Sequence, residues 1–240
     1  MKALAQAFAI ARFRRLDLEW HLPGSLIPLV LLFIFFLLGG MELGQHVLVG
    51  WLVMVGASGG VSVLPQAVLF YRYIRLQEMY VAAPIHPLTF MMGMGLYSLV
   101  HSLPAWGFVL AVMYVLGLLP APTIPLVLLV LLLAWGMACA IGFLIAMAVR
   151  RIAIISVVAT MVWLLLISLP PVLYPADLIP ETFRWAAWLF PTAHIAQLLR
   201  GSLGMTELAT WEFIMHWAVS LAVTCVLLVW VAARSRWREV

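Results

Sequence analysis

The 240-residue sequence is 66% hydrophobic and only 9% charged, which excludes a soluble domain, since such a domain carries roughly 25% charged residues on its water-facing surface. The formal net charge of +4 does not indicate a nucleic-acid partner, because the basic residues are scattered in short groups along the chain. Cys139 and Cys225 lie inside apolar runs and predict no disulfide framework. The composition therefore predicts an integral membrane protein.

Residues 1–22 are predicted to form a helix in the membrane interface. Apolar side chains recur on one stripe of residues 3–20, whereas Arg12, Arg15 and Glu19 fall on another face. A helix of this kind lies along the bilayer surface, here anchored by Trp20. The apolar run that follows is long and has no small-residue cleavage site after it, so the segment is not predicted to be a cleavable signal peptide.

Six segments are each long and apolar enough to cross a bilayer as an α-helix, which takes about 20 residues. The predicted spans are residues 23–41, 47–70, 88–118, 123–149, 152–170 and 213–233. No repeat or low-complexity linker divides them. The prediction is an all-α integral membrane protein with one domain, residues 1–240, in which residues 23–233 form a six-span bundle and residues 234–240 a cytoplasmic tail.

The distribution of lysine and arginine predicts the orientation of this bundle. If the N-terminus is cytoplasmic, eleven of the 13 basic residues fall on the cytoplasmic side, and the opposite side holds only Arg184 and Arg200. Positive side chains are enriched in cytoplasmic segments of multi-pass proteins. Both termini are therefore predicted to be cytoplasmic.

Several kinds of chemistry are missing from the sequence. Lys2 is its only lysine, so it contains no G-x-x-x-x-G-K-[ST] phosphate-binding loop. The predicted spans contain no Asp or Glu, which ion-coupled carriers commonly place at mid-membrane. His101, well inside a span, is expected to bond another helix rather than relay a proton. No residue group has metal-ligand spacing. Uphill transport would therefore take its energy from a partner.

Residues 56–60 in the second span read Gly-Ala-Ser-Gly-Gly, and the first four resemble the serine motif of rhomboid intramembrane proteases. Those proteases pair the serine with a histidine on the last span, where this chain has His216. However, Ser58 lies on span two rather than span four, and His216 is expected near the outer end of its helix. The G-x-x-x-G spacing of Gly56 and Gly60 favours close helix packing, and the protease is kept as the alternative.

Residues 172–212 form the one long segment on the outer side, and it is unusually apolar. Pro180 suits the first turn of a helix, and Pro191 must interrupt that helix. Gly201 suits the end of a second short helix that starts near Thr192. The pattern predicts two re-entrant half-helices between spans five and six, with a lipid-anchored loop as the alternative.

This order of features resembles the permease subunits of ABC-2 type exporters. In that family a proline precedes a short helix, and Pro-Thr-like residues and a terminal Arg-Gly follow, all between the last two spans. The residues that match are Pro180, Trp185, Pro191, Thr192, Arg200 and Gly201. The resemblance implies an extracellular gate, which Arg200 is expected to hold through an acid such as Asp177 or Glu181.

Residues 72–84, between spans two and three, resemble the coupling helix of the same family, including its acidic residue and the following Ala-Pro. The residues expected to contact an ATPase are Arg72, Arg75, Gln77, Glu78 and Tyr80. Arg72, Arg75 and Glu78 are spaced by three, so on one helix they would share a face. Anchoring of the arginines to anionic lipid is the alternative, but anionic lipid would repel Glu78.

The resemblance covers nearly the whole chain and implies half of an ATP-driven exporter in the cell membrane. It implies that ATP and Mg²⁺ bind a separate ATPase subunit, that this chain is not itself an enzyme and holds no cofactor, and that two permease copies form the path. The sequence lacks the tryptophan-rich start of polysaccharide exporters, which favours a drug-like or amphiphilic substrate. The alternatives are export of a lipid-linked polysaccharide and a scaffold or receptor that transports nothing.

Overall fold

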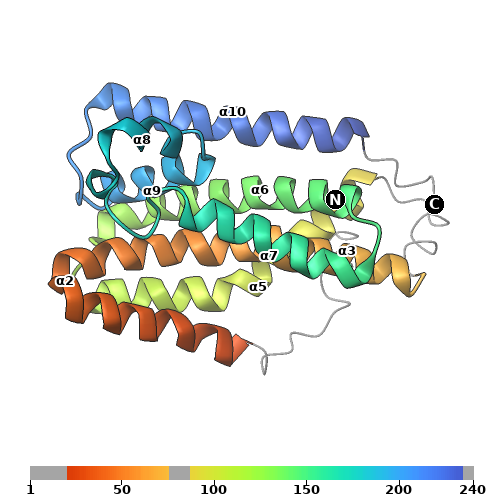
Figure 1. The fold of residues 1–240 in the computed structure, drawn as a ribbon, viewed down its shortest axis with the longest axis horizontal. Coiled ribbons are helices and arrows are strands. Elements are labelled where there is room, and N and C mark those ends of the chain that lie inside the picture. Colours follow the sequence, from red (N-terminus) through yellow and green to blue (C-terminus); the bar gives the residue numbers. More distant parts are fainter. Residues whose placement is uncertain (1–20, 76–86, 235–240) are drawn as a thin grey trace.

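The computed structural model describes residues 21–75 and 87–234, and the regular elements among them are all helices (Figure 1). Lipid offers no hydrogen-bond partner to the backbone, so an apolar spanning segment bonds its own N–H and C=O groups as a helix. Residues 1–20, most of the predicted interfacial helix, lie outside the described residues. So do three of the predicted coupling residues, Gln77, Glu78 and Tyr80, and residues 235–240 of the predicted tail.

The long helices account for most of the described chain, and short helices connect them. In chain order the elements are α2 (His21–Ser58), η2 (Gly59–Val63), α3 (Leu64–Tyr73), α5 (Pro87–Val115), η3 (Ala121–Thr123), α6 (Ile124–Ala148), α7 (Ile152–Ser168), η4 (Ala176–Leu178), α8 (Glu181–Ala187), α9 (Pro191–Ser202) and α10 (Thr210–Arg234). The second limb of α2 continues through η2 into α3 as one rod.

Helix α2 reverses direction at Gly40, where its two limbs meet at one end of the bundle (Figure 1). Gly40 has φ 64° and ψ −158°, a conformation that only glycine adopts without strain. The predicted spans 23–41 and 47–70 fall on these two antiparallel limbs. A single glycine therefore separates them, where the sequence predicted a short connection.

Four helical stretches among the described residues are long and apolar enough to cross a membrane. These are Leu43–Tyr73, Leu88–Val115, Ala121–Ala148 and Thr210–Arg234. The other two predicted spans correspond to α7, an apolar helix of 17 residues, and to the first limb of α2. The protein is thus an α-helical, multi-pass membrane protein, and six crossings remain a prediction.

The second span and α6 approach each other closely at Gly60 and Gly142. A Cβ atom on Gly60 would lie 2.5 Å from the backbone nitrogen of Cys139, and one on Gly142 would overlap the carbonyl oxygen of Gly60. A Cβ on Gly56 would instead meet the ring of Trp106, at 2.8 Å. Gly60 lies in η2, a π-helical stretch. Only glycine lets the two backbones pack this closely at Gly60.

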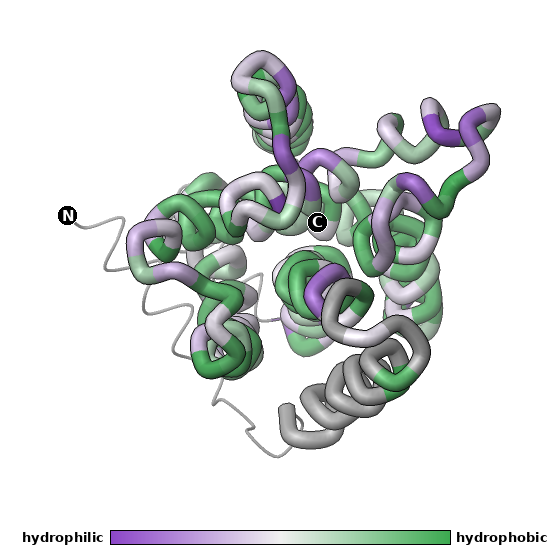
Figure 2. Tube along the Cα trace, turned by 90° about the vertical axis from the view of Figure 1, so that its left-hand side faces the viewer, coloured by the Kyte–Doolittle hydropathy of each residue, from purple (hydrophilic) through white to green (hydrophobic). Residues whose placement is uncertain are grey.

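The two ends of the bundle differ in structure. One end carries α8, α9 and the Gly40 reversal, and the other carries the end of α3 and the C-terminus of α10 (Figure 1). Viewed from the α8–α9 end, the long helices are largely hydrophobic and hydrophilic residues gather in the connecting segments (Figure 2). The polar groups of the described residues are therefore concentrated where the chain leaves the apolar bundle.

Candidate functional site

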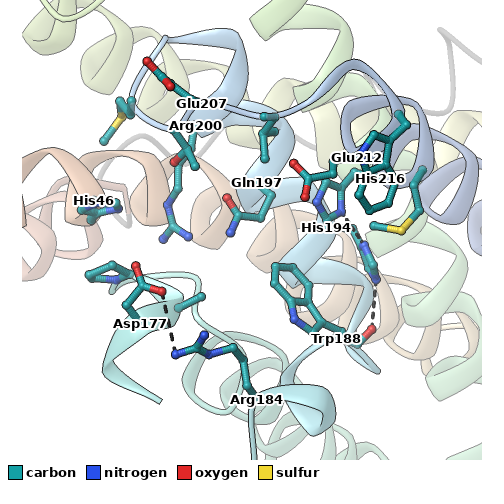
Figure 3. A pocket seen from close by; sticks show the side chains of 17 residues that line it. His46, Asp177, Arg184, Trp188, His194, Gln197, Arg200, Glu207, Glu212 and His216 are labelled. Atoms are coloured by element: carbon teal, nitrogen blue, oxygen red, sulfur yellow. Dashed lines mark hydrogen bonds and ion pairs between the residues drawn. The ribbon is translucent and has the colours of Figure 1, made fainter. Parts of the chain in front are cut away.

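A cavity of about 740 Å³ opens at the α8–α9 end of the bundle (Figure 3). Its walls come from α2, the segment around η4, α8, α9, residues 205–208 and the start of α10. The side chains that line it include several polar and charged groups, namely His46, Asp177, Arg184, His194, Gln197, Arg200, Thr206, Glu207, Glu212 and His216. An enclosure of this size falls in the range of small-molecule sites, roughly 300–1,000 Å³.

Two short helices, α8 and α9, contribute to the cavity wall, and each has a proline at its start. Pro180 is the residue before α8, and Pro191 is the first residue of α9, where a missing N–H costs no hydrogen bond. Helix α9 runs to Ser202, one residue beyond Gly201, and the left-handed residue that follows is Gly204, with φ 70°. Gly201 is therefore not the residue that ends this helix, contrary to the sequence expectation.

Helix α9 is buried from Thr192 to Arg200, packed against α10, α2 and α6. The Oγ1 of Thr192 donates a hydrogen bond to the carbonyl oxygen of Leu166 in α7. One Nη of Arg200 donates to the carbonyl oxygens of Val172, at 2.8 Å, and Tyr174, at 3.0 Å. Two polar side chains thus tie α9 to α7 and to the segment after it.

The predicted ion pair of Arg200 with Asp177 or Glu181 is wrong. Arg200 is 1% exposed and bonds the neutral carbonyls, whereas Asp177 lies 3.9 Å from a guanidinium nitrogen of Arg184. Burial lowers the pKa of Arg200 to about 10, so the group is still charged at neutral pH. The carbonyls of Val172 and Tyr174 take the place that an acid would occupy at the guanidinium, and this arrangement was not readable from the sequence.

His194 and His216 form a pair on the cavity wall. Their Nδ1 atoms are 2.8 Å apart, and Nε2 of His194 is 3.0 Å from the carbonyl oxygen of Trp188. A carbonyl only accepts, so Nε2 of His194 carries its proton and Nδ1 accepts from the Nδ1–H of His216. The Trp188 ring packs against both imidazoles. The hydrogen-bond network therefore assigns the tautomers of both neutral rings.

Four buried polar atoms on the cavity lining have no hydrogen-bond partner among the described residues. They are Nδ1 of His46, Nε of Arg184, Oε1 of Gln197 and Nε of Arg200. Sequence reasoning missed His46, His194 and Gln197. His194, Gln197 and Arg200 recur every three residues in a segment of small and apolar residues, and this spacing was the signal that could have found them.

The other predicted gate residue, Trp185 of α8, is 66% exposed and does not line the cavity. The structure thus groups Pro191, Thr192 and Arg200 on one buried helix, whereas Trp185 lies on the neighbouring short helix and Pro180 immediately precedes that helix. A gating role for these residues stays a prediction.

Helix α3 ends at the opposite end of the bundle (Figure 1), and the two coupling residues that the structure describes, Arg72 and Arg75, lie in its last turn and just after it. Nη1 of Arg72 donates to the carbonyl oxygen of Ala146 in the last turn of α6, at 2.9 Å. Arg75 is exposed and has φ 57°. The prediction that both arginines share one short helix is wrong, because α3 ends at Tyr73 and the chain then turns left-handed.

The two side chains of the alternative serine-protease hypothesis are engaged elsewhere. The hydroxyl of Ser58 donates to the carbonyl oxygen of Val55 in its own helix, at 2.8 Å. Nδ1 of His216 is bonded to His194. A serine nucleophile needs a histidine within hydrogen-bond reach, and these contacts do not provide one.

The fold and the cavity define a multi-pass membrane protein whose polar groups converge at one end of an apolar bundle. Residues 42–234 match the sequence model of the family described as ABC-2 family transporter protein, and the chain belongs to that family. It is accordingly a membrane permease of the ABC transporter class, and the family implies partnership with an ABC ATPase subunit. No curated protein sequence matches this chain.

Proposed function

We propose that this chain is one permease subunit of an ATP-driven exporter that carries a drug-like or amphiphilic substrate across the cell membrane. The observation that carries the proposal is the separation of two features at opposite ends of one bundle. Exposed Arg75 and half-buried Arg72 are at one end, and the cavity beside α9 is at the other. An exporter needs a contact for its energy source on one side of the membrane and an exit on the other.

The arginine end is the docking site for the ATPase. Arg72 is held by the carbonyl of Ala146, so a push on this end reaches α3 and α6 together. Arg75 follows the helix and is exposed to a partner. Gln77, Glu78 and Tyr80 continue the same segment in sequence. ATP and Mg²⁺ bind the partner subunit, which performs the hydrolysis.

The α8–α9 end is the exit, and it faces the outside of the cell, with both termini in the cytoplasm. Helix α9 forms part of the gate. Its hydrogen bonds to the carbonyls of Leu166, Val172 and Tyr174 couple it to the end of α7 and to the segment that follows. Pro180, Trp185, Pro191, Thr192 and Arg200 belong to this gate.

A second permease copy, identical or paralogous, completes the path. Only 22% of the apolar stretch of α10 is buried within this chain. Most of the surface of this helix is therefore available to another subunit or to lipid. Apolar helix surfaces of this kind pack against neighbouring helices or acyl chains in the bilayer.

The test is purification of the tagged chain with its ATPase, followed by ATP-dependent export of a fluorescent amphiphile from proteoliposomes. The variant Glu78→Arg should keep ATPase binding and insertion but uncouple hydrolysis from export. Glu239→Arg makes the same charge change in the tail and should behave as the parent. If hydrolysis and export stay coupled in Glu78→Arg as in the parent protein, the docking assignment is wrong. If no ATPase copurifies with the chain, the exporter assignment is wrong.

A further inference from the structure

The cavity beside α9 holds a buried positive charge with no counter-ion among the described residues. Arg200 is 1% exposed, and its hydrogen bonds go to two neutral carbonyls. A buried charge is costly unless it is paired and hydrogen-bonded. Its pKa of about 10 keeps it protonated at neutral pH, so it does not escape this cost by losing its proton.

The carboxylates around the cavity are occupied or exposed. Asp177 is paired with Arg184, and an oxygen of Glu212 accepts the backbone N–H of Ala209 at 2.9 Å. Glu207 is exposed to solvent, which screens its charge. None of the three lies within 4.0 Å of the Arg200 guanidinium. The site is therefore built around a cation for which this part of the chain provides no acid.

The polar groups at and beside Arg200 also lack hydrogen-bond partners. Its Nε, Oε1 of Gln197 and Nδ1 of His46 are buried and have no partner among the described residues, and all three side chains face the same space (Figure 3). Arg Nε–H is a donor, a neutral histidine donates from Nδ1 in one tautomer, and the glutamine amide can turn its NH₂ toward the cavity. Three donors can thus converge on one acceptor group.

Apolar side chains also line the cavity, and they indicate what the acceptor group is attached to. Trp188, Met205, Leu208 and Met215 line the cavity together with the polar groups. The volume of about 740 Å³ is far larger than an inorganic ion occupies. An apolar chain attached to the anion would fill the remaining space and cover these side chains.

We propose that this cavity binds the phosphate or carboxylate group of an amphiphile, with Arg200 as the charge partner and Gln197 and His46 as orienting donors. This rests on the proposed export function, since it makes an anionic amphiphile the exported substrate. Binding itself is measurable without transport, so the two assignments fail separately.

The experiment measures equilibrium binding of n-dodecyl phosphate to the purified full chain in neutral maltoside micelles, with protein-free micelles as the blank. Arg200 is not the residue to replace, because its bonds hold residues 172–174. Gln197→Glu is nearly isosteric and places a negative charge beside Arg200. Gln45→Glu is the matched control, since it makes the same change next to His46 at a position that does not line the cavity.

Dodecyl phosphate should bind saturably to the parent and to Gln45→Glu, and at least about tenfold more weakly to Gln197→Glu, as expected for like charges in a partly buried site. Inorganic phosphate and dodecyltrimethylammonium should bind far more weakly. Equal binding of dodecyl phosphate to the two variants would refute the assignment of the site. Binding of inorganic phosphate as tight as that of dodecyl phosphate would refute the assignment of an amphiphile as the ligand. Intact binding without ATP-driven export would support the site and refute the export function.

Discussion

The Nδ1 atoms of His194 and His216 lie 2.8 Å apart, so one hydrogen bond joins α9 directly to α10. Only one proton occupies the space between these atoms. A doubly protonated pair would direct two N–H groups and two positive charges at each other. The Nε2–H of His194 donates a hydrogen bond to the carbonyl oxygen of Trp188, and Glu212 is the acid close enough to interact with His216 electrostatically.

This pair predicts that the protein loses stability in mild acid. Burial lowers the pKa of His194, although the bond to the Trp188 carbonyl acts in the opposite direction. Because the folded-state pKa lies below the unfolded value of about 6.5, the unfolded chain takes up the proton first. The contribution of the pair to the free energy of unfolding is therefore fully present above about pH 6.5, and it decreases as the pH falls below this value.

The measurement is the melting temperature between pH 8 and pH 5. His194→Gln can keep the bond to the Trp188 carbonyl but does not titrate, so its melting temperature should fall less than that of the parent. Parallel curves for the two proteins would mean that the pair does not contribute to the pH dependence.

Arg200 is predicted to stabilise the fold more than Arg184. Arg200→Met would remove hydrogen bonds to Val172 and Tyr174 and leave one buried and one partly buried carbonyl unpaired, at about 1–3 kcal/mol for the buried one and less for the other. Arg184→Met removes an ion pair with Asp177, whose side chain is 90% exposed, worth about 0–1 kcal/mol. Thermal unfolding in detergent should rank Arg200→Met well below Arg184→Met. The reverse ranking would contradict the assigned role of the carbonyl bonds.

Gly60→Ala is predicted to destabilise the bundle, because its Cβ would meet the backbone of α6 at Ala138 and Cys139, which cannot move as a side chain can. Overpacking of this kind costs typically about 1–3 kcal/mol. Gly107→Ala is the control, since no atom lies within 4 Å of its added Cβ. The melting temperature should fall for Gly60→Ala alone. A matching fall in both variants would indicate a general effect of replacing glycine in a helix.

Cysteine labelling is predicted to report a cytoplasmic N-terminus. In a variant that lacks Cys139 and Cys225, a cysteine at position 78 or 239 should react with a membrane-impermeant maleimide only from the cytoplasmic side. A cysteine at position 207 should react from the outside. The reason is the excess of basic residues on the cytoplasmic side. Reaction of position 78 from outside would reverse the orientation and both end assignments.

Pro191→Ala is predicted to impair export while the protein still inserts and folds. Pro191 is the first residue of α9, and its ring helps to separate α9 from α8. Alanine would allow the two short helices to join across residues 188–190. Export from proteoliposomes, compared at equal amounts of folded protein, is the readout. Parental export rates would show that the break between the helices is not needed for gating.

Features that depend on composition and on local backbone chemistry could be predicted from the amino-acid sequence. A charge content of 9% leaves lipid as the solvent of most of the chain, and in lipid the backbone must form helices. Pro180 and Pro191 set the starts of the two short helices, because proline restricts φ and lacks an N–H wherever it occurs. These constraints act within a few residues along the chain, so they can be predicted from the sequence.

Which distant groups contact one another is seen only in the three-dimensional packing. Arg200 bonds carbonyls 26 and 28 residues away, and His46 reaches the cavity of α9 from the other half of the chain. Likewise, α3 ends at Tyr73 and Arg72 turns to the carbonyl of Ala146. Apolar helices carry little pattern to identify the face that packs against a given neighbour. The partners of their few polar side chains therefore follow from three-dimensional packing and from the need to satisfy buried hydrogen-bonding groups.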